Sequence, residues 1–229
     1  MIGNDIVDLH FFDSPFYHHV QYLDRICTPA ESRVVRQSAD PCRTLAIIWA
    51  SKEAAYKLLS KQLVRCSFIP EEFVTHLDAR VVPHSKANCL VAHAGARANV
   101  SICMTEAWVH AVATQHHDDV VHWIVRDIEK CYSPGCKTCC ESEAASILAT
   151  ELLSNHGHED TVVEFVGRVP TLRAQSAVPA GIGISLSHHG AFASAAIAWP
   201  SGENSPQRQM RRHFAATSVS EGMCSTCMV

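Results

Sequence analysis

Three charged residues lie within one stretch that reads as a helix, and their types suit phosphate or metal chemistry. Glu53 and Lys57 are four positions apart, so both project from the same face of the helix predicted over residues 41–62. An isolated pair of this kind is usually a surface ion pair worth a few tenths of a kcal/mol. Lys52 falls among the apolar positions of the same helix, where an ammonium group must reach water or meet an anion. The helix therefore predicts either an ordinary ion pair or a site for an anionic ligand.

Asp5 supplies a second carboxylate, inside a short apolar run at residues 2–9. A lone carboxylate in that position is commonly a strand-edge or turn residue. Beside Glu53, however, it offers a second hard oxygen ligand, and Mg²⁺ is usually held by one or two carboxylates together with water and substrate phosphate. Two carboxylates with nearby lysines would equip the protein to handle a pyrophosphate.

A third polar group is the segment SLSHHG, residues 185–190. The two-residue period of a strand places Ser185 and Ser187 on one face and His188 on the other. A serine and a histidine together also suggest a hydrolase, but the Gly-x-Ser-x-Gly pattern and its strand-to-helix elbow are absent. We favour hydroxyl and imidazole groups gathered at a strand end to bind phosphate, with a simple polar turn as the alternative.

The eleven cysteines point in a different direction. Residues 131–140 carry the spacing Cys-x4-Cys-x2-Cys-Cys, with His156 and His158 further along, and this is the best zinc candidate in the chain. Adjacent cysteines rarely ligate one tetrahedral ion together, so a reduced surface loop is the preferred interpretation. The pair Cys224 and Cys227 has the spacing of a redox dithiol but falls in the polar C-terminal stretch.

Composition sets limits on the class of protein. The chain has 229 residues, 47% of them hydrophobic, which is enough for a real core. No apolar run reaches the roughly 20 residues that cross a bilayer, and the first residues lack the basic start of a secretory signal. The formal net charge of −4 argues against general nucleic-acid binding. We therefore expect a cytoplasmic protein with no membrane and no nucleic-acid partner.

The elements that must position these residues come in two cycles of strand, helix and strands. The first cycle is predicted at residues 2–9, 41–62, 79–82, 88–94, 98–104 and 108–114, with a further helix beginning at Thr28. The second is predicted at residues 120–128, 143–154, 161–172 and 183–199. The pattern predicts an α+β fold of two similar α/β halves, a pseudo-dimer in which each half packs a helix on a small antiparallel sheet. The halves would span residues 1–115 and 116–200, followed by a flexible tail at 201–229.

Three segments in this order resemble the motifs of the 4′-phosphopantetheinyl transferase superfamily. They are residues 2–7 (IGNDIV), residues 49–57 (WASKEAAYK) and residues 185–188 (SLSH). The helix start at residues 28–31 and the turn at residues 167–170 (GRVP) are also similar to family features. The resemblance covers about residues 1–62 and 161–199. It implies an enzyme that moves the 4′-phosphopantetheine group of coenzyme A onto a serine of an apo acyl or peptidyl carrier protein and releases 3′,5′-ADP.

The resemblance also implies roles for individual residues. Asp5 and Glu53 would hold Mg²⁺ against the pyrophosphate, and Glu53 and Lys57 would be the catalytic residues, with Glu53 assisting removal of the serine proton.

The coenzyme A contacts follow from the same resemblance. Lys52 would join Lys57 in neutralising phosphate oxygens. Ser187 and His188 would hold the 3′-phosphate of coenzyme A, with Arg168 as a further candidate.

Two departures from the family pattern concern the first strand. Asn4 replaces the usual isoleucine, and Val7 stands where the two-half, surfactin-type enzymes carry an additional acidic ligand. Asp8 lies close enough to be an alternative ligand.

The order of the motifs favours a monomer of two fused halves, with a trimer of synthase units carrying a long insertion as the alternative. Two other functions remain open. One is a family member with altered or lost activity, and the other is a zinc-binding interaction protein built around residues 131–158.

Overall fold

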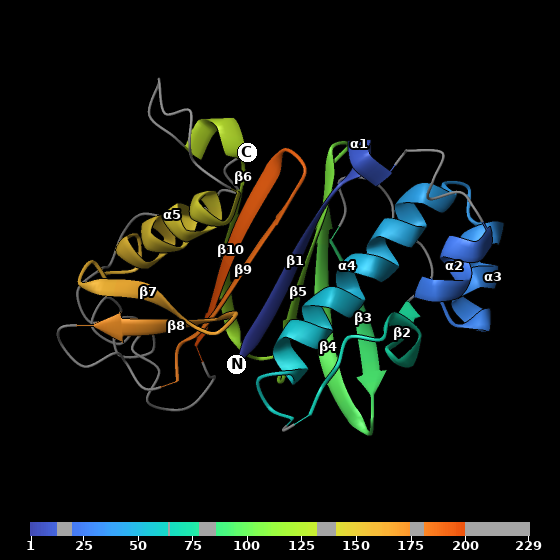
Figure 1. Cartoon of the computed structure of the whole chain (residues 1–229), viewed down its shortest axis with the longest axis horizontal. Coiled ribbons are helices and arrows are strands. Elements are labelled where there is room, and N and C mark those ends of the chain that lie inside the picture. The colour runs from blue at the N-terminus through green and yellow to red at the C-terminus, as the bar shows by residue number, and fades with distance from the viewer. Residues whose placement is uncertain (13–19, 64, 78–85, 132–140, 175–180, 200–229) are drawn as a thin grey trace, which may run out of the picture.

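The described residues form two larger antiparallel sheets, each with one long helix on its outer side, and a separate two-stranded sheet (Figure 1). The computed structural model describes residues 1–12, 20–63, 65–77, 86–131, 141–174 and 181–199. At the centre of the view, strand β1 of the first sheet runs beside strand β9 of the second.

The first sheet has five strands in the order β1-β5-β4-β3-β2. They are β1 (Ile2–Asp8), β2 (Val74–Leu77), β3 (Lys86–His93), β4 (Ala96–Met104) and β5 (Trp108–Thr114). Its helical elements are α1 (Leu9–Phe12), α2 (Val20–Ile26), α3 (Pro29–Gln37), α4 (Pro41–Leu59) and η2 (Pro70–Glu72). The core of this half lies between α4 and the sheet, where the α4 residues Ile48, Ala54 and Leu58 are fully buried.

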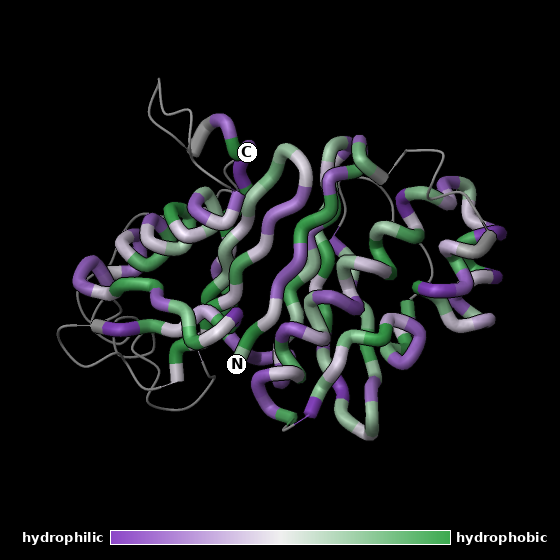
Figure 2. The backbone as a smooth tube through the Cα atoms, in the orientation of Figure 1, coloured by the Kyte–Doolittle hydropathy of each residue, from purple (hydrophilic) through white to green (hydrophobic). Residues whose placement is uncertain are grey.

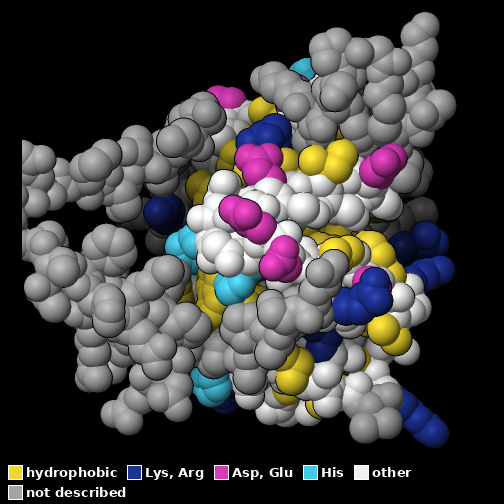
Figure 3. Space-filling model, turned by 90° about the vertical axis from the view of Figure 1, so that its left-hand side faces the viewer, with side chains coloured by type: hydrophobic (Ala, Val, Ile, Leu, Met, Phe, Trp, Pro, Cys, Tyr) yellow, Lys and Arg dark blue, Asp and Glu magenta, His cyan; other side chains and the backbone are white. Residues whose placement is uncertain are grey.

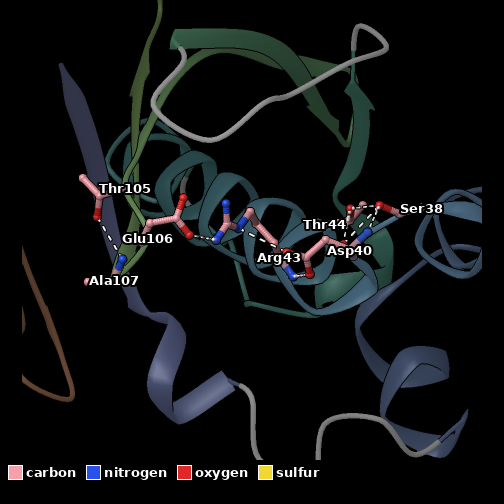
Figure 4. A network of polar contacts seen from close by, with 7 residues as sticks. All are labelled: Ser38, Asp40, Arg43, Thr44, Thr105, Glu106 and Ala107. Carbon is pink, nitrogen blue, oxygen red and sulfur yellow. Dashed lines mark hydrogen bonds and ion pairs between the residues drawn. The ribbon is translucent and has the colours of Figure 1, made fainter.

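Helix α4 begins where local chemistry predicts it. The Asp40 carboxylate accepts a hydrogen bond from the backbone N–H of Arg43 at 2.9 Å, and Pro41 occupies the first helical position. The Arg43 guanidinium then donates to Glu106 at 2.9 Å, which ties the start of the helix to the turn between β4 and β5 (Figure 4). Helix α4, which carries Glu53 and Lys57, is thus fixed at its first turn.

The second sheet has three strands in the order β6-β10-β9, and a separate two-stranded sheet lies beside it. Its strands are β6 (Val120–Asp127), β9 (Gly183–His189) and β10 (Phe192–Trp199), and the additional pair is β7 (Thr161–Val166) with β8 (Val169–Ala174). The helical elements are η3 (Ile128–Cys131) and α5 (Glu141–Ser154). Figure 3 shows this side of the molecule, where acidic and apolar side chains lie next to one another.

The two sheets repeat one connectivity. In each, a first strand leads to the long helix, and the last strand pairs on one side with the first strand and on the other with the strand before it, giving β1-β5-β4 and β6-β10-β9. The sheets meet through a small apolar cluster that contains Ile2, Val112, Ala196 and Ala198. Figure 2 shows apolar segments in the strands on both sides of this contact. The short alanine side chains of β10 allow the backbones to come close.

The α+β prediction is confirmed, and so is the capped helix that begins after Thr28. The main helix is confirmed with a shorter end, because it was predicted over residues 41–62 and spans Pro41–Leu59. Strand β2 was not predicted; the strand expected at residues 79–82 and the tail at 201–229 lie outside the described residues. The boundary expected between the halves falls between the end of β5 at Thr114 and the start of β6 at Val120. In the described part of the chain, no helix has the length and apolar character to cross a membrane.

Candidate active site

A cleft of about 380 Å³ lies where β1, α4 and the end of β9 meet. Its lining residues are Asp5, Ile6, Tyr22, Trp49, Glu53, Lys57, Leu186, Ser187, His188 and His189. The structure therefore brings together Asp5, Glu53, Lys57, Ser187 and His188, which come from all three predicted motifs.

Gly3 sets the distance between α4 and β1. A Cβ atom at this position would collide with the backbone oxygen of Ala54 and would lie 2.6 Å from the backbone nitrogen of Leu58. Because only glycine leaves this space empty, the backbones of helix and strand can lie in contact. This close approach brings the α4 side chains Glu53 and Lys57 to Asp5 of β1.

Asp5, Lys57 and Ser187 form a closed network at the base of the cleft. The Lys57 ammonium donates to Asp5 Oδ1 at 2.9 Å, to Ser187 Oγ at 3.1 Å and to the Asn4 carbonyl at 3.0 Å. The Ser187 hydroxyl donates to the same Asp5 oxygen at 2.8 Å. Asp5 is only 7% exposed, so its charge depends on these donors.

Glu53 lies in a part of the cleft that disfavours its negative charge. Burial, followed by the negative charge of Asp5, raises the pKa of Glu53 to about 7, while the Lys57 ammonium works in the opposite direction. Two carboxylates that share one half-buried site are poorly neutralised by a single lysine. A further cation at this point would lower the free energy of the ionised pair.

The donor set of the cleft fits Mg²⁺. Asp5 and Glu53 supply carboxylate oxygens, which Mg²⁺ prefers, and the raised pKa of Glu53 marks a deficit of positive charge at this point. No group of three or more His, Cys, Asp or Glu residues within the described ranges could hold a metal ion, so water or a ligand would complete the coordination.

The prediction that Ser185 and Ser187 lie on one face of the strand and His188 on the other is confirmed. Ser185 and Ser187 face β1 and accept hydrogen bonds from the backbone N–H groups of Asn4 and Ile6, at 2.9 and 3.3 Å. His188 points the other way, toward the start of α5. Its Nδ1 lies 2.9 Å from a Glu141 carboxylate oxygen, and its Nε2 lies 3.3 Å from the Ser142 hydroxyl.

Lys52 does not reach the cleft, which corrects the expectation that it neutralises coenzyme A phosphates. Its side chain is fully buried, and its ammonium donates to Glu31 Oε2 at 2.7 Å and to the carbonyls of Ile26 and Pro70 at 2.7 and 2.9 Å. All three donors of the ammonium are therefore used. The other Glu31 oxygen accepts from the backbone N–H of Thr75, so the Lys52–Glu31 pair links α4, α3 and β2. The anion that pairs with Lys52 is therefore the carboxylate of Glu31 and not that of a ligand.

Arg168 is exposed, in the turn between β7 and β8, and does not line the cleft. The expectation that it contacts coenzyme A stays a prediction.

The position of Asp8 settles which acidic residue of β1 belongs to the cleft. Its carboxylate accepts from the backbone N–H groups of His10 and Ala191, both at 2.9 Å, so it caps the start of α1 and holds the turn between β9 and β10. Val7 is fully buried in the core. Asp5 is therefore the acidic side chain that β1 contributes.

Asn4, which departs from the family pattern, is fully buried in a polar contact between the sheets. Its amide nitrogen donates to Ser194 Oγ at 2.8 Å and lies 3.3 Å from His110 Nε2. Burial lowers the pKa of His110 to about 3, so this imidazole is neutral. The polar residue joins the two halves and leaves Asp5 in place.

Sequence reasoning missed two residues beside the cleft. The backbone N–H of Asp8 donates to His189 Nδ1 at 3.0 Å, and the ammonium of Lys61 donates to the carbonyls of Ile2 and Ile184, both at 2.7 Å. Spacing was the available signal, because Lys61 follows Lys57 by four residues and His189 follows Ser187 by two. The cysteine segment proposed for zinc lies at residues 131–140, of which 132–140 are outside the described residues.

Comparisons with known proteins agree with the motifs. The model of a family described as the 4′-phosphopantetheinyl transferase superfamily matches residues 1–113, which include Asp5, Glu53 and Lys57. The chain is also similar to a holo-[acyl-carrier-protein] synthase of Moorella thermoacetica, with 32% identity over 114 residues. That alignment covers 48% of this chain and 89% of the relative.

Proposed function

The chain belongs to the 4′-phosphopantetheinyl transferase superfamily, and from this premise we propose that it transfers the 4′-phosphopantetheine group of coenzyme A to a serine of an apo acyl or peptidyl carrier protein. In this reaction the serine oxygen forms a bond to the phosphorus that bears the pantetheine. The bond from that phosphorus to the bridging oxygen breaks, and 3′,5′-ADP leaves. The hydroxyl proton is taken up by the protein.

The observation that carries this proposal is the presence of two carboxylates and one lysine in the lining of the same cleft. Asp5 and Glu53 line the same cleft as Lys57, whose ammonium lies 2.9 Å from Asp5. A pyrophosphate is a dense anion, and its transfer is accelerated mainly by fixed positive charge near the phosphoryl oxygens. The cleft offers one lysine and a place for one divalent cation.

Asp5 and Glu53 would hold the Mg²⁺ ion. When bound, Mg²⁺ neutralises the pyrophosphate and stabilises the charge that develops on the leaving oxygen. Lys57 would contribute a second positive charge to the same oxygens.

Glu53 would also take the serine proton, directly or through a water molecule. Glu53 lines the cleft and, when ionised, is a carboxylate base within the site. Ser187 orients Asp5 by its hydrogen bond of 2.8 Å. His188, at the mouth of the cleft, would meet the 3′-phosphate of coenzyme A.

One chain would form a complete site, since the cleft takes Asp5, Glu53 and Lys57 from the first half and Ser187 and His188 from the second. We therefore propose a monomer with pseudo-dimeric halves. The repeated strand order supports this part of the proposal.

The test is mass spectrometry of an apo carrier protein after incubation with this protein, coenzyme A and Mg²⁺. An acyl carrier protein and a peptidyl carrier protein are assayed separately. The expected result is a gain of one phosphopantetheine group on at least one carrier, abolished by its serine-to-alanine variant. Binding of coenzyme A with no transfer to either carrier would overturn the proposal and favour a family member with altered activity.

A further inference from the structure

Strand β1 is an edge strand whose outward backbone groups are bonded by side chains instead of by another strand. It pairs with β5 on one side only. On the other side, the N–H groups of alternate residues are accepted by side chains of β9. These donor and acceptor pairs are Asn4 with Ser185, Ile6 with Ser187 and Asp8 with His189. An edge strand normally leaves such groups to water or to a partner strand.

The outward carbonyls of the same edge are bonded by two lysines of the α4 chain segment. Lys57 donates to the Asn4 carbonyl at 3.0 Å, and Lys61 donates to the Ile2 carbonyl at 2.7 Å. Lys57 lies in the last turn of α4, and Lys61 lies two residues past the end of the helix at Leu59. The two lysines thus bond two successive outward carbonyls of β1 and fix the end of α4 on this strand.

Lys61 differs from Lys57 because it also bonds to the second half. Its ammonium donates to the Ile184 carbonyl of β9 at 2.7 Å, equal to its distance from Ile2 on β1. Within the described ranges no carboxylate lies within ion-pair distance of it. Burial, and then the charge of Lys57, lower the pKa of Lys61 to about 8. A half-buried lysine that bonds two carbonyls without a counterion carries a desolvation cost, and an apolar residue would avoid that cost.

We propose that Lys61 is a positioning residue of the proposed transferase site, which holds β1 against β9 and thereby holds Asp5 beside Glu53 and Ser187. This inference rests on the proposed function for its catalytic consequence. Ile2 begins β1, three residues before Asp5, and it is held by β5 on one side. Without Lys61 the start of β1 loses its bond to β9, and the Asp5 carboxylate moves relative to α4.

Arginine is the conservative replacement. Lys61 lines a second cavity, of about 480 Å³, together with Ile2, Pro170, Gly183 and Ile184. We expect this space to accommodate a guanidinium group, which has several donors for the two carbonyls. Methionine fills the same volume with no donor.

The experiment compares Lys61→Met, Lys61→Arg and the control Lys86→Met, which removes an exposed lysine of β3. Two readouts require no activity: binding of Mn²⁺, as a spectroscopic substitute for Mg²⁺, and hydrogen exchange of the backbone amides of Asn4 and Ile6. We expect Lys61→Met to weaken Mn²⁺ binding about tenfold, which corresponds to about 1.4 kcal/mol, and to speed both exchange rates. Lys61→Arg should stay within about threefold of the native protein, as should Lys86→Met.

A transferase assay adds a third readout. We expect Lys61→Met to lower kcat about tenfold while the KM for coenzyme A changes less than threefold, and Lys61→Arg to restore kcat. If Lys61→Met does not fold, Lys61→Gln replaces it, because its shorter amide cannot span both carbonyls.

Native Mn²⁺ affinity and native amide exchange in folded Lys61→Met or Lys61→Gln would overturn the inference. Lack of transfer by the native protein would overturn the proposed function instead, and amide exchange would still decide the role of Lys61.

Discussion

The two sheets of this molecule have the same connectivity in β1-β5-β4 and β6-β10-β9, but the first half supplies both carboxylates and the lysine of the cleft. Their strand ends match in detail: the backbone N–H of Leu9 donates to Ala107 at 2.9 Å, and that of Ile128 donates to Ala191 at 2.8 Å. This match places Asp5, opposite Ala111, where the second half has Ile124, opposite Ala195. The second half therefore lacks a carboxylate at the position that binds Lys57 in the first.

The two long helices differ in the same way. Both contain the sequence Glu-Ala-Ala, at residues 53–55 and 143–145. Counting from these glutamates, Lys57 corresponds to Ile147 and Lys61 corresponds to Glu151. Glu151 forms a two-pronged ion pair with Arg126 of β6, at 2.7 and 2.8 Å. The second helix is thus held by an ordinary ion pair, and the first by lysines that bond to backbone carbonyls.

The distance between helix and first strand is the third difference. Gly3 corresponds to His122, whose ring lies 4.0 Å from that of His156. A glycine lets α4 touch β1, whereas an imidazole occupies the matching position of β6. The two sheets therefore share a connectivity, and a glycine, a carboxylate and two lysines distinguish the helix–strand contact of the first.

The sharpest test of this comparison replaces the two matched glutamates, Glu53 and Glu143, with glutamine in separate variants. Glu53→Gln removes a proposed metal ligand and proton acceptor, and we expect transferase activity to fall on the order of 10²–10³-fold. Glu143→Gln changes the corresponding exposed residue of α5, and activity should stay within about threefold. The measurement is kcat/KM for a carrier protein. Equal losses in both variants would mean that the halves do not differ in the proposed way.

Replacement of Gly3 tests the close approach of helix and strand. Gly3→Ala places a Cβ atom against the backbone of Ala54 and Leu58, and we expect a loss of about 3 kcal/mol in the free energy of unfolding. His122→Ala, at the matching position, should cost about 1 kcal/mol. Urea denaturation measures both. A Gly3→Ala variant as stable as the native protein would show that α4 does not need the contact.

The contacts that form the cleft differ in how well the sequence predicts them. Helix α4 was predictable because its cap at Asp40 and its apolar stripe are local signals. The same stripe predicted that Lys52 either reaches water or meets an anion. The structure shows the second outcome, but sequence cannot distinguish a ligand from Glu31, 21 residues earlier. The contact of β1 with β9 joins residues about 180 positions apart through side chains, and no periodicity encodes it. Only the family motifs placed Asp5 and Ser187 in one site.

Ser187 tests the contact between the halves. In Ser187→Ala the N–H of Ile6 loses its acceptor and the Asp5 carboxylate loses a donor. We expect a loss of about 2 kcal/mol in the free energy of unfolding, because both groups are buried. Cys103 holds the matching place in β4, since Cys103 pairs with His110 as Ser187 pairs with Ser194. Cys103→Ala should cost less than about 1 kcal/mol, and a reversed order in thermal denaturation would contradict the assignment.

The smallest expected effect is a pH dependence of stability that arises from Glu53. Because the pKa of Glu53 is raised to about 7 in the folded protein, the folded state keeps a proton that the unfolded state releases between about pH 4.5 and 7. The native protein should therefore lose stability across this range relative to Glu53→Gln, and the difference should stay constant at higher pH. We expect about 1 kcal/mol at pH 8, or about 2–4 °C in melting temperature.

Glu143→Gln is the matched control and should follow the native curve throughout. Mg²⁺ should remove the difference at pH 8, since it favours the ionised Asp5 and Glu53 that Glu53→Gln no longer provides. Parallel melting curves for the native protein and Glu53→Gln from pH 5 to 8 would show that the two carboxylates do not share one poorly neutralised site.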